Sequence, residues 1–360
     1  MVTIKAEALQ TLVRDIFVKA GCSPEEAGRV GRYLVAANLT GHDSHGVVRV
    51  PRYVQMKNDG LIVADQKVEV LVETPVLAVV DACYGFGQTA APQAVQIGID
   101  KCRRMGLSAV GLRNAGHIGR VCDWAEMAAE AGLVSVHFVN AAGSNLVAPF
   151  GGVERRFSTA PYCVGVPRPG HAPLILDFAT SVVAEGKVLV ASRGGKKIPD
   201  NALIAPDGGT SGDPHVLYGD YTPTGPRDYR KGPGAIRAFG EHKGSGLAFM
   251  CEILGGALTG TGATLEGRRF ANGMFSFYVD PGIVDPAGFL PAEVTRYVGY
   301  VKSAKPIPGA EILVPGEQEE RMRRKRLAEC VPLADDIWQS IVDCARALGL
   351  DERRIQRATA

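Results

Sequence analysis

Closely spaced cysteine pairs are missing from this sequence, although it contains eight cysteines in 360 residues. Without a C-x-x-C pair, the sequence gives no support for a disulfide framework, a zinc ribbon or a thioredoxin-type redox site. Free thiols, most of them buried, are the expected state of these cysteines.

Long apolar runs and an excess of one charge sign are lacking as well. No apolar stretch approaches the ~20 residues that a membrane-spanning helix requires, and the chain opens on an amphipathic helix instead of a secretory signal. The net charge is +2 with 22% charged residues, so nothing indicates a nucleic-acid interface or a polybasic membrane anchor. We therefore expect a cytoplasmic protein with no nucleic-acid partner and no membrane partner.

The N-terminal region has a helical pattern. Apolar residues recur at three- and four-residue steps over residues 4–20, which predicts a helix that stops at Gly21. Ser23, followed by Pro24 and by Glu26 three residues later, forms a capping-box pattern that begins a second helix. The chain therefore opens with a small helical domain.

The pattern changes near Val68 to strands that alternate with helices. Single hydrophobic cores rarely grow beyond about 250 to 300 residues, so 360 residues should form two domains. Two C-terminal helices, at residues 334–348 and 352–357, are expected to rejoin the N-terminal helices. We predict a mixed α/β (α+β) protein whose parts are a helical substrate and dimer domain at residues 1–62, completed by 305–360, and an α/β domain at 63–304.

Residues 41–53 concentrate reactive side chains. If Ser44 caps a helix, then His45, Arg49 and Tyr53 follow at four-residue steps on one face of it. A guanidinium grips a carboxylate with two hydrogen bonds, and an imidazole titrates near neutral pH. This face is therefore suited to hold a small carboxylate and to protonate an oxygen beside it.

Alternatives remain open for this stretch. Pro51 falls inside the expected helix, where it removes a hydrogen bond and clashes with the preceding turn, so the helix should kink or end near it. A single His and Arg on a helix face are more often surface groups than a site. His42 and His45 would suit a metal ion, but no third ligand follows at ligand spacing, so no metal is expected.

Residues 85–90 fit G-x-G-x-x-A between a strand and a helix, as in the dinucleotide fingerprint of Rossmann folds. That fingerprint also needs an acidic residue at the end of the second strand, and this strand ends in Arg113 and Asn114. The glycines are therefore expected to form a tight turn.

A second glycine-rich segment, residues 114–119, places glycines on both sides of His117. These glycines allow a ligand close to the backbone, and N–H groups at the start of the next helix are suited to a phosphate. A turn with a structural histidine is the alternative.

The second half of the chain offers weaker signals. Leu174–Asp177 has the pattern of a strand, and Asp177, Thr180 and Ser181 are candidate caps for a segment at 182–190. The least regular part, residues 193–236, is of the kind that often forms exposed lids.

Two later segments have the character of ligand-binding turns. A helix opening near Glu241 would hold an anion with its N–H groups and Lys243, and a buried role for His242 is the alternative. A strand near Ile312 is expected to run into a tight turn at 315–317.

Six motifs resemble, in order and over nearly the whole chain, the malate/L-lactate dehydrogenase family, and most closely its hydroxycarboxylate dehydrogenase branch. That family also holds sulfolactate dehydrogenases and cyclic-imine carboxylate reductases. The motifs are S-H-G-V-x-R-x-P-x-Y (44–53), N-A-G-H-I-G-R (114–120), V-A-P-F-G-G (147–152), L-D-F-A-T-S (176–181), E-H-K-G-S-G-L-A (241–248) and L-V-P-G-E (313–317).

The resemblance implies a nicotinamide-binding domain that is not a Rossmann fold, with a largely antiparallel sheet, and a second subunit that closes the cleft. It also implies that His117 lines the active cleft and that Thr159 touches the substrate, next to Ala160 where relatives usually carry Asn. The residues expected to contact the cofactor are His45, Gly119, Arg120, Val121, Ile175, Leu176, Asp177, Phe178, Ala179, His242, Lys243, Asn272, Leu313, Val314, Pro315, Gly316 and Glu317.

The leading hypothesis is an NAD(P)-dependent 2-hydroxycarboxylate dehydrogenase that reduces a 2-oxo acid reversibly. His45 would be the general acid, with Ser44 fixing its tautomer and His117 as the rival, while Arg49 and Tyr53 would bind the carboxylic-acid substrate. NAD is expected over NADP, because no Arg is placed at a ribose phosphate, and a homodimer is expected because an open cleft exposes hydride chemistry to water. A cyclic imino-acid reductase and a non-catalytic small-acid binding protein are the alternatives.

Overall fold

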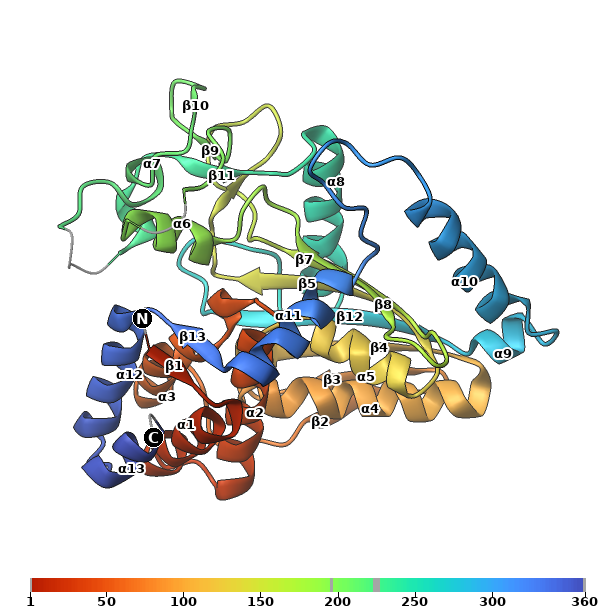
Figure 1. Cartoon of the computed structure of the whole chain (residues 1–360), viewed down its shortest axis with the longest axis horizontal. Helices are drawn as coiled ribbons and strands as arrows, with labels where there is room; N and C mark the ends of the chain where they lie inside the picture. The colour runs from red at the N-terminus through yellow and green to blue at the C-terminus, as the bar shows by residue number, and fades with distance from the viewer. Residues whose placement is uncertain (1, 195–196, 223–226, 359–360) are drawn as a thin grey trace.

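The computed structural model describes residues 2–194, 197–222 and 227–358 as a mixed α/β protein, so the predicted class is confirmed (Figure 1). Its largest sheet has the strand order β2-β3-β4-β12-β5-β7-β8. These strands are Glu69–Glu73 (β2), Leu77–Asp81 (β3), Leu107–Ala115 (β4), Val134–Ala142 (β5), Pro161–Val166 (β7), Leu174–Ala179 (β8) and Ala271–Val279 (β12).

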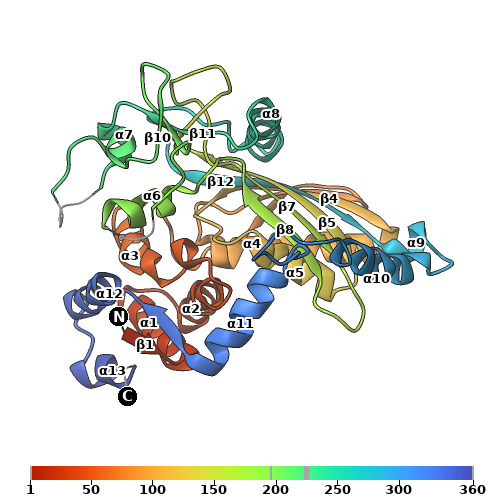
Figure 2. The ribbon, with the colours of Figure 1, turned by 45° about the horizontal axis from the view of Figure 1, so that its top comes forward.

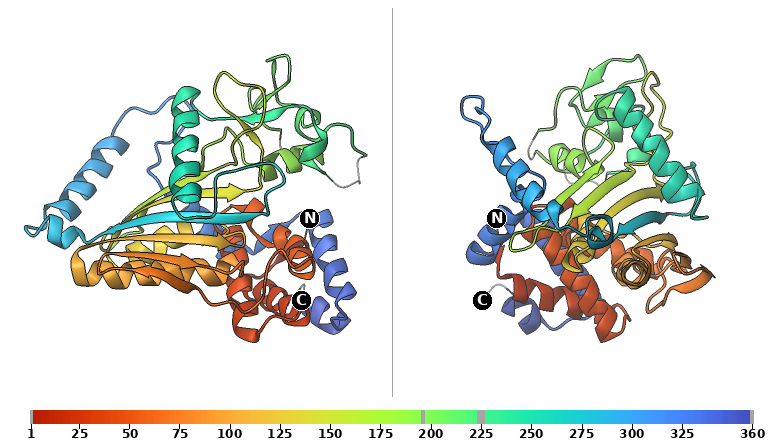
Figure 3. Two further views of the ribbon diagram at one scale, coloured as in Figure 1. Left: turned by 180° about the vertical axis from the view of Figure 1, so that it is seen from behind. Right: turned by 90° about the vertical axis from the view of Figure 1, so that its right-hand side faces the viewer.

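Neighbouring strands of this sheet are antiparallel except β3 and β4, which are parallel and are joined by α4 (Gly87–Met105). On one face, α4 and α5 (Cys122–Glu130) pack through an alanine-rich core that includes the fully buried Trp124. On the other face stand α8 (His242–Cys251) and the π-helical turn that continues it, as the left view of Figure 3 shows.

Both ends of the chain build the helical part, because one core joins N-terminal and C-terminal side chains such as Leu9, Phe17, Ile341 and Ile355. Its helices are α1 (Ala6–Lys19), α2 (Pro24–Leu39), α3 (Val50–Asn58), α12 (Asp335–Ala347) and α13 (Glu352–Arg357). The expected return of the C-terminal helices is confirmed, whereas the domain boundaries at residues 62 and 304 stay predictions.

The N-terminal helix starts later than its apolar pattern suggests. Residues Val2–Ile4 form β1, which pairs antiparallel with β13 (Val331–Leu333), so Ile4 belongs to a strand. The second helix starts as predicted, since Ser23 Oγ accepts from Glu26 N at 3.2 Å. Glu26, however, does not complete the capping box, because its carboxylate accepts from Asp65 N and Thr89 Oγ1 instead.

The described residues of the segment 193–236, which are 193–194, 197–222 and 227–236, are not simply an irregular lid. Together with α6 (Glu185–Ser192) and β6 (Val147–Ala148), they form a separate apolar core around Val188, Leu217 and Ile236. Their elements are β9 (Leu203–Ile204), β10 (Thr210–Ser211), α7 (His215–Tyr218) and β11 (Ala235–Arg237), and the sheet order is β10-β9-β11-β6. The predicted caps for the 182–190 segment are wrong, because Ala184 is the N-cap of α6 and no side chain caps it.

The connection from β12 back to the C-terminal helices holds three helices, α9 (Pro281–Val284), α10 (Phe289–Lys302) and α11 (Glu317–Glu329). α10 follows α9 and stands away from the rest of the chain, as the right view of Figure 3 shows. α11 lies along α2 and beside α5 (Figure 2). The expected strand near Ile312 is wrong, because residues 311–314 have no regular structure.

Candidate active site

Residues 41–53 do not form the single helix that their spacing suggested. Asp43–His45 and Val47–Arg49 are two separate 3₁₀ turns, and Gly46 between them is extended, with φ −87° and ψ −153°. α3 begins only at Val50, with Pro51 in its first turn. Proline therefore starts this helix, where its missing N–H costs nothing, and does not kink one.

The predicted side chains nevertheless come together. The rings of His45 and His117 are nearly parallel, with centroids 5.5 Å apart and planes at 12°. Ser44 Oγ lies 3.2 Å from His45 Nδ1, and Arg49 Nε donates to Ser44 O at 2.6 Å. Within the described residues, the two Nη groups of Arg49 form no hydrogen bond, which leaves them available to a carboxylate.

Tyr53 lies behind His117 and is only 1% exposed. Its Oη is 2.5 Å from His117 Nδ1. Gln88, also 1% exposed, donates from Nε2 to Tyr53 Oη at 3.3 Å and to His117 O at 3.2 Å. Gln88 was not predicted, because it lies within the glycine-rich segment at 85–90, where no periodicity or motif distinguishes it. Tyr53 as a substrate contact stays a prediction.

Both histidines are neutral in this site at pH 7. Burial lowers the pKa of His45 well below 6.5, and the neighbouring His117 and Arg49 lower it further. Burial, then Arg49, lowers the pKa of His117 to about 3, and burial raises the pKa of Tyr53 to about 12. A bound carboxylate beside Arg49 would oppose the effect of Arg49 on both imidazoles.

Two residues outside this loop, Asn38 on α2 and Arg326 on α11, hold its shape. Asn38 Oδ1 accepts from Val47 N at 2.8 Å, and Asn38 Nδ2 donates to Asp43 Oδ1 at 2.6 Å. Arg326, on α11, donates to both carboxylate oxygens of Asp43, at 2.6 and 3.0 Å. A Cβ on Gly46 would lie 2.2 Å from Asn38 Oδ1, so only glycine fits there.

Helices α6 and α7, which share the apolar core of the sheet β10-β9-β11-β6, form a further wall of the site. A Cβ on Gly186, in α6, would lie 2.5 Å from Ser44 Cβ, so α6 packs directly on the His45 turn. Tyr218, on α7, donates to Glu185 Oε1 at 2.5 Å. Burial, followed by Glu185, raises the pKa of Tyr218, and the charge of Arg49 offsets part of that rise. No pattern in the sequence indicated the contact of α6 with Ser44.

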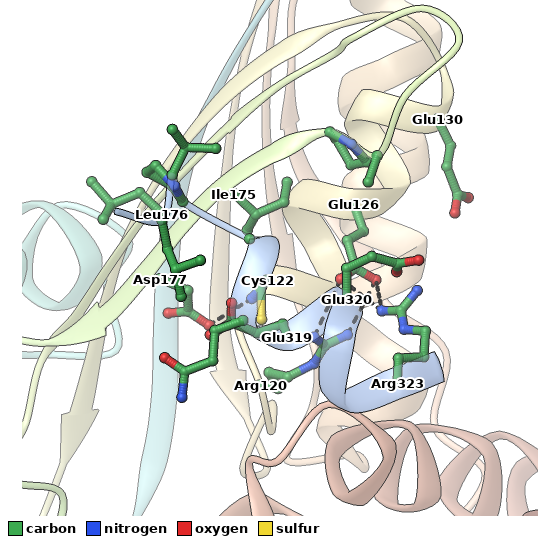
Figure 4. A pocket seen from close by; sticks show the side chains of 17 residues that line it. Arg120, Cys122, Glu126, Glu130, Ile175, Leu176, Asp177, Glu319, Glu320 and Arg323 are labelled. Atoms are coloured by element: carbon green, nitrogen blue, oxygen red, sulfur yellow. Dashed lines mark hydrogen bonds and ion pairs between the residues drawn. The ribbon is translucent and has the colours of Figure 1, made fainter. Parts of the chain in front are cut away.

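A cavity of about 330 Å³ brings together three segments that were predicted separately. It is lined by Arg120, by Ile175 to Asp177 on β8, and by Leu313 to Gly316 before α11 (Figure 4). Glu317 lines an adjoining cavity of about 280 Å³ together with Arg168 and His171. The two cavities share Ala172, Pro173, Pro315, Gly316 and Glu320 in their walls, so they are adjacent parts of one groove.

The two arginines that line the first cavity are paired with carboxylates. Arg120 bonds Asp123. It also bonds Glu126 at 3.1 Å, and Arg323 bonds the same Glu126 at 2.9 Å (Figure 4). Burial alone would lower the pKa of Arg120, but Asp123 and Glu126 raise it, so the guanidinium stays charged. Burial raises the pKa of Asp123 to about 6, although Arg120 lowers it.

Asp177 has a structural function besides its place in the cavity. Its Oδ2 accepts from Cys122 N at 2.8 Å and thereby caps α5. The next N–H groups, of Asp123 and Trp124, bond Arg120 O and Val121 O. The start of this helix is therefore already bonded within the protein, which disfavours the phosphate site that the sequence suggested there.

The cavity and the histidine pair are neighbours. His42 Nε2 lies 3.4 Å from Glu319 Oε1, on the α11 wall of the cavity. The charge of Arg120 reaches His45 and contributes to its lowered pKa.

Other predicted residues lie outside the lining of the two cavities. Val121 is 2% exposed, Gly119 has φ +74°, and Phe178 and Ala179 continue β8 past the lining. His242 packs against Phe150 at the start of α8, next to Lys243. Asn272, 4% exposed, donates to Asn140 O and accepts from Ile118 N. Their contact with a cofactor stays a prediction.

The segment with Thr159 is anchored by a buried carboxylate. Glu252, 3% exposed in the π-helical turn, accepts from Ser158 N and Oγ at 2.9 and 2.7 Å. Thr159 O accepts from Thr180 N at 3.0 Å. Ala160 has φ +27°, a backbone conformation that Asn tolerates better than Ala.

The model of the malate/L-lactate dehydrogenase family matches residues 4–342. The chain belongs to this malate/L-lactate dehydrogenase family. It is 37% identical to hydroxycarboxylate dehydrogenase B of Escherichia coli K12, over 98% of this chain and 96% of that one. It is 34% identical, over 73% of each chain, to the delta(1)-pyrroline-2-carboxylate/delta(1)-piperideine-2-carboxylate reductase of Pseudomonas syringae.

A solved structure of a putative malate/lactate dehydrogenase from E. coli superimposes on this malate/L-lactate dehydrogenase family member with a TM-score of 0.91 and 37% identity, covering 99% of this chain and 98% of that one. The resemblance on which the sequence analysis relied is thereby confirmed, and the chain is an oxidoreductase of this family. Within the described residues, no three His, Cys, Asp or Glu side chains are grouped to hold a metal ion. No helix in the same part of the chain has the length and apolar character to cross a membrane.

Proposed function

We propose that the protein is an NAD(P)-dependent oxidoreductase that interconverts a 2-oxo acid and its 2-hydroxy acid. One observation carries the proposal: Arg49, whose Nη groups form no hydrogen bond within the described residues, lies in the 3₁₀ turn next to that of His45, which stacks on His117 near the cavity at β8. A cation for a carboxylate and ring N–H groups for the neighbouring oxygen are what a 2-oxo acid requires.

The groove fits a nicotinamide cofactor chemically. Its apolar side chains, such as Ile175 and Val314, suit flat rings, and its carboxylates suit ribose hydroxyls. The adjoining cavity adds Arg168, His171 and Arg324, whose charge or N–H groups suit phosphate. The groove residues, among them Ile175, Val314 and Arg168, would hold a nicotinamide cofactor, which in its reduced form would provide the hydride for the carbonyl carbon of the substrate.

The protein's own groups perform the remaining work. Arg49 holds the substrate carboxylate and orients the adjacent carbonyl. His45 gives a proton to the carbonyl oxygen as it gains charge and takes it back in the oxidising direction. Ser44 keeps the His45 ring in place from the Nδ1 side. The wall of α6 and α7 limits water at this point.

We propose NAD as the preferred cofactor. In the first cavity, Arg120 and Arg323 already face Asp123 and Glu126. The lining also contains Glu130, Asp177, Glu319 and Glu320, which would repel a 2′-phosphate and accept hydrogen bonds from a free 2′-hydroxyl. Titrating the protein with NADH and with NADPH, followed by nicotinamide fluorescence, tests this preference. Tighter binding of NADPH would contradict it.

A cyclic imino acid is the second candidate substrate class. It is supported by the delta(1)-pyrroline-2-carboxylate/delta(1)-piperideine-2-carboxylate reductase of P. syringae among the relatives. A 2-imino acid has the same carboxylate, and its nitrogen stands where the 2-oxo oxygen would.

A panel of 2-oxo acids and cyclic 2-imino acids, followed at the nicotinamide absorbance with NADH, tests the function. We expect turnover of at least one 2-oxo acid and little with the matching uncharged amide. Turnover of imino acids alone would replace the first candidate by the second. Binding of NADH without turnover of any acid would overturn both.

A further inference from the structure

Gln88 is a buried residue that the proposed function does not use. It lies in the first turn of α4, directly beneath the histidine pair, and is 1% exposed. Its Nε2 donates both to Tyr53 Oη and to the backbone oxygen of His117, at 3.3 and 3.2 Å. Its Oε1 is buried without a hydrogen-bond partner in the described part of the chain. A residue present only for packing would avoid that desolvation cost.

The contact with the His117 backbone determines which way the Gln88 amide faces. A carbonyl oxygen only accepts hydrogen bonds, so the amide nitrogen must be the atom directed at His117 O. The same nitrogen then donates to Tyr53 Oη. If the Gln88 amide were rotated by 180°, its Oε1 would face His117 O, and two acceptors would then be in contact.

The orientation of Gln88 in turn determines the proton on Tyr53. Because Tyr53 Oη accepts from Gln88, its own hydrogen is directed at the other near neighbour, His117 Nδ1, at 2.5 Å. A neutral imidazole that accepts at Nδ1 carries its hydrogen on Nε2. The chain of donors therefore runs from Gln88 through Tyr53 to His117.

We propose that Gln88 and Tyr53 are positioning residues that hold His117 in its Nε2–H tautomer, so that His117 is a fixed hydrogen-bond donor to the substrate oxygen. The inference rests on the proposed function for its substrate, but the tautomer itself does not depend on turnover. His45 differs, because a serine hydroxyl at Nδ1 both donates and accepts. The two histidines therefore have different roles. His45 exchanges its proton with the substrate, whereas His117 keeps its proton and donates a hydrogen bond.

The tautomer is measurable directly. Protein labelled with ¹⁵N-histidine is studied by NMR at pH 7.5, and the His117 signals are assigned by their loss in His117→Gln. We expect the Nε2–H pattern in the wild type and a mixture of tautomers in Tyr53→Phe, which removes only the hydroxyl. Gln93→Met is the matched control on α4, because within the described residues the Gln93 side chain bonds Thr89 O and Val68 N and no group of the histidine pair.

Kinetics supply the second readout. Loss of one hydrogen bond in this chain should lower kcat for the acid substrate about three- to tenfold in Tyr53→Phe and in Gln88→Met. The dissociation constant of NADH and the midpoint of urea unfolding of Tyr53→Phe should change little. If Gln88→Met does not fold, Tyr53→Phe alone decides.

An Nδ1–H pattern for wild-type His117, or an unchanged pattern in Tyr53→Phe, would overturn the inference. The expected pattern in a protein that turns over no acid would leave the inference standing and overturn the proposed function instead.

Discussion

Arg49 is the residue on which recognition of an acid depends most directly. Its Nε is held by Ser44 O, so the guanidinium is oriented before any substrate arrives. A charge-assisted hydrogen bond contributes about 1.5 to 3 kcal/mol, so Arg49→Ala should lower kcat/KM for the acid about tenfold or more. Arg52→Ala, an exposed arginine on α3, is the control and should change little.

The test of Arg49 compares two substrates. Arg49→Ala should lower kcat/KM strongly for the carboxylic acid and only slightly for its uncharged amide. An equal loss for both would mean that Arg49 supports the loop and not the substrate.

His45 determines the pH dependence of the reaction. Reduction needs the protonated imidazole, and the pKa of His45 lies well below 6.5, so its protonated fraction falls about tenfold per pH unit above that pKa. The kcat/KM for reduction should therefore rise as pH falls from 7.5 to 5.5, while oxidation, which needs the neutral ring, should not gain in that direction. Steady-state rates in both directions provide the measurement.

Replacing each histidine separates their roles. General acid catalysis contributes about 10² to 10⁴ in rate, so His45→Ala should lose that much turnover and still bind NADH. His117→Ala should lose less, because it removes a donor and not the acid. If kcat/KM of His45→Ala for reduction still rises as pH falls from 7.5 to 5.5, another group gives the proton.

At the scale of elements, the His45 turn shows what local spacing failed to predict. Residues 44–53 have helical spacing, but Gly46 separates two 3₁₀ turns, and Asn38 and Arg326 hold that shape from α2 and α11. The contact of Arg326 with Asp43 joins residues far apart in the sequence, and such a contact leaves no trace in local periodicity. The long helices α1, α2, α4 and α12 were predictable because their apolar faces repeat over several turns.

Gly46 offers a direct test of that turn. A methyl group there would overlap Asn38 Oδ1, so Gly46→Ala should destabilise the protein by about 1 to 3 kcal/mol in urea unfolding and lower activity as the His45 turn shifts. Gly28→Ala on α2 is the control, because nothing lies within 4 Å of its added carbon. It should be neutral or stabilising by up to about 1 kcal/mol. Equal stability of Gly46→Ala and Gly28→Ala would contradict the close contact.

At the scale of the whole molecule, the residues that the motifs singled out do lie close together: His45 stacks on His117, and β8 shares one cavity with residues 313–316, whereas their roles stay predictions. The motifs missed Gln88, the α6 and α7 wall, and the small sheet, whose strands of two or three residues are too short to show a period. Side chains that carry chemistry recur in motifs, whereas those that support them are recognised only from tertiary contacts.

α10 bears on the oligomeric state. This helix of 14 residues buries only Val298 and leaves Phe289, Tyr297 and Tyr300 between 56% and 68% exposed. Isolated helices of about 12 to 15 residues are marginal in water, and exposed aromatic clusters mark interfaces. We therefore propose that α10 packs on a second copy of the chain, which gives the homodimer expected from the open cleft.

Sedimentation at micromolar concentration should show a dimer. The double change Phe289→Asp and Tyr300→Asp should shift it to monomer, because burying one large apolar side chain contributes about 1.5 to 3 kcal/mol and a buried carboxylate opposes association. Val18→Asp, on the exposed side of α1 at the other end of the molecule, should remain dimeric. A wild-type protein that sediments as an active monomer would contradict the proposal. A dimer that persists in the Phe289→Asp and Tyr300→Asp variant would also contradict it, because α10 would then stay folded without a partner.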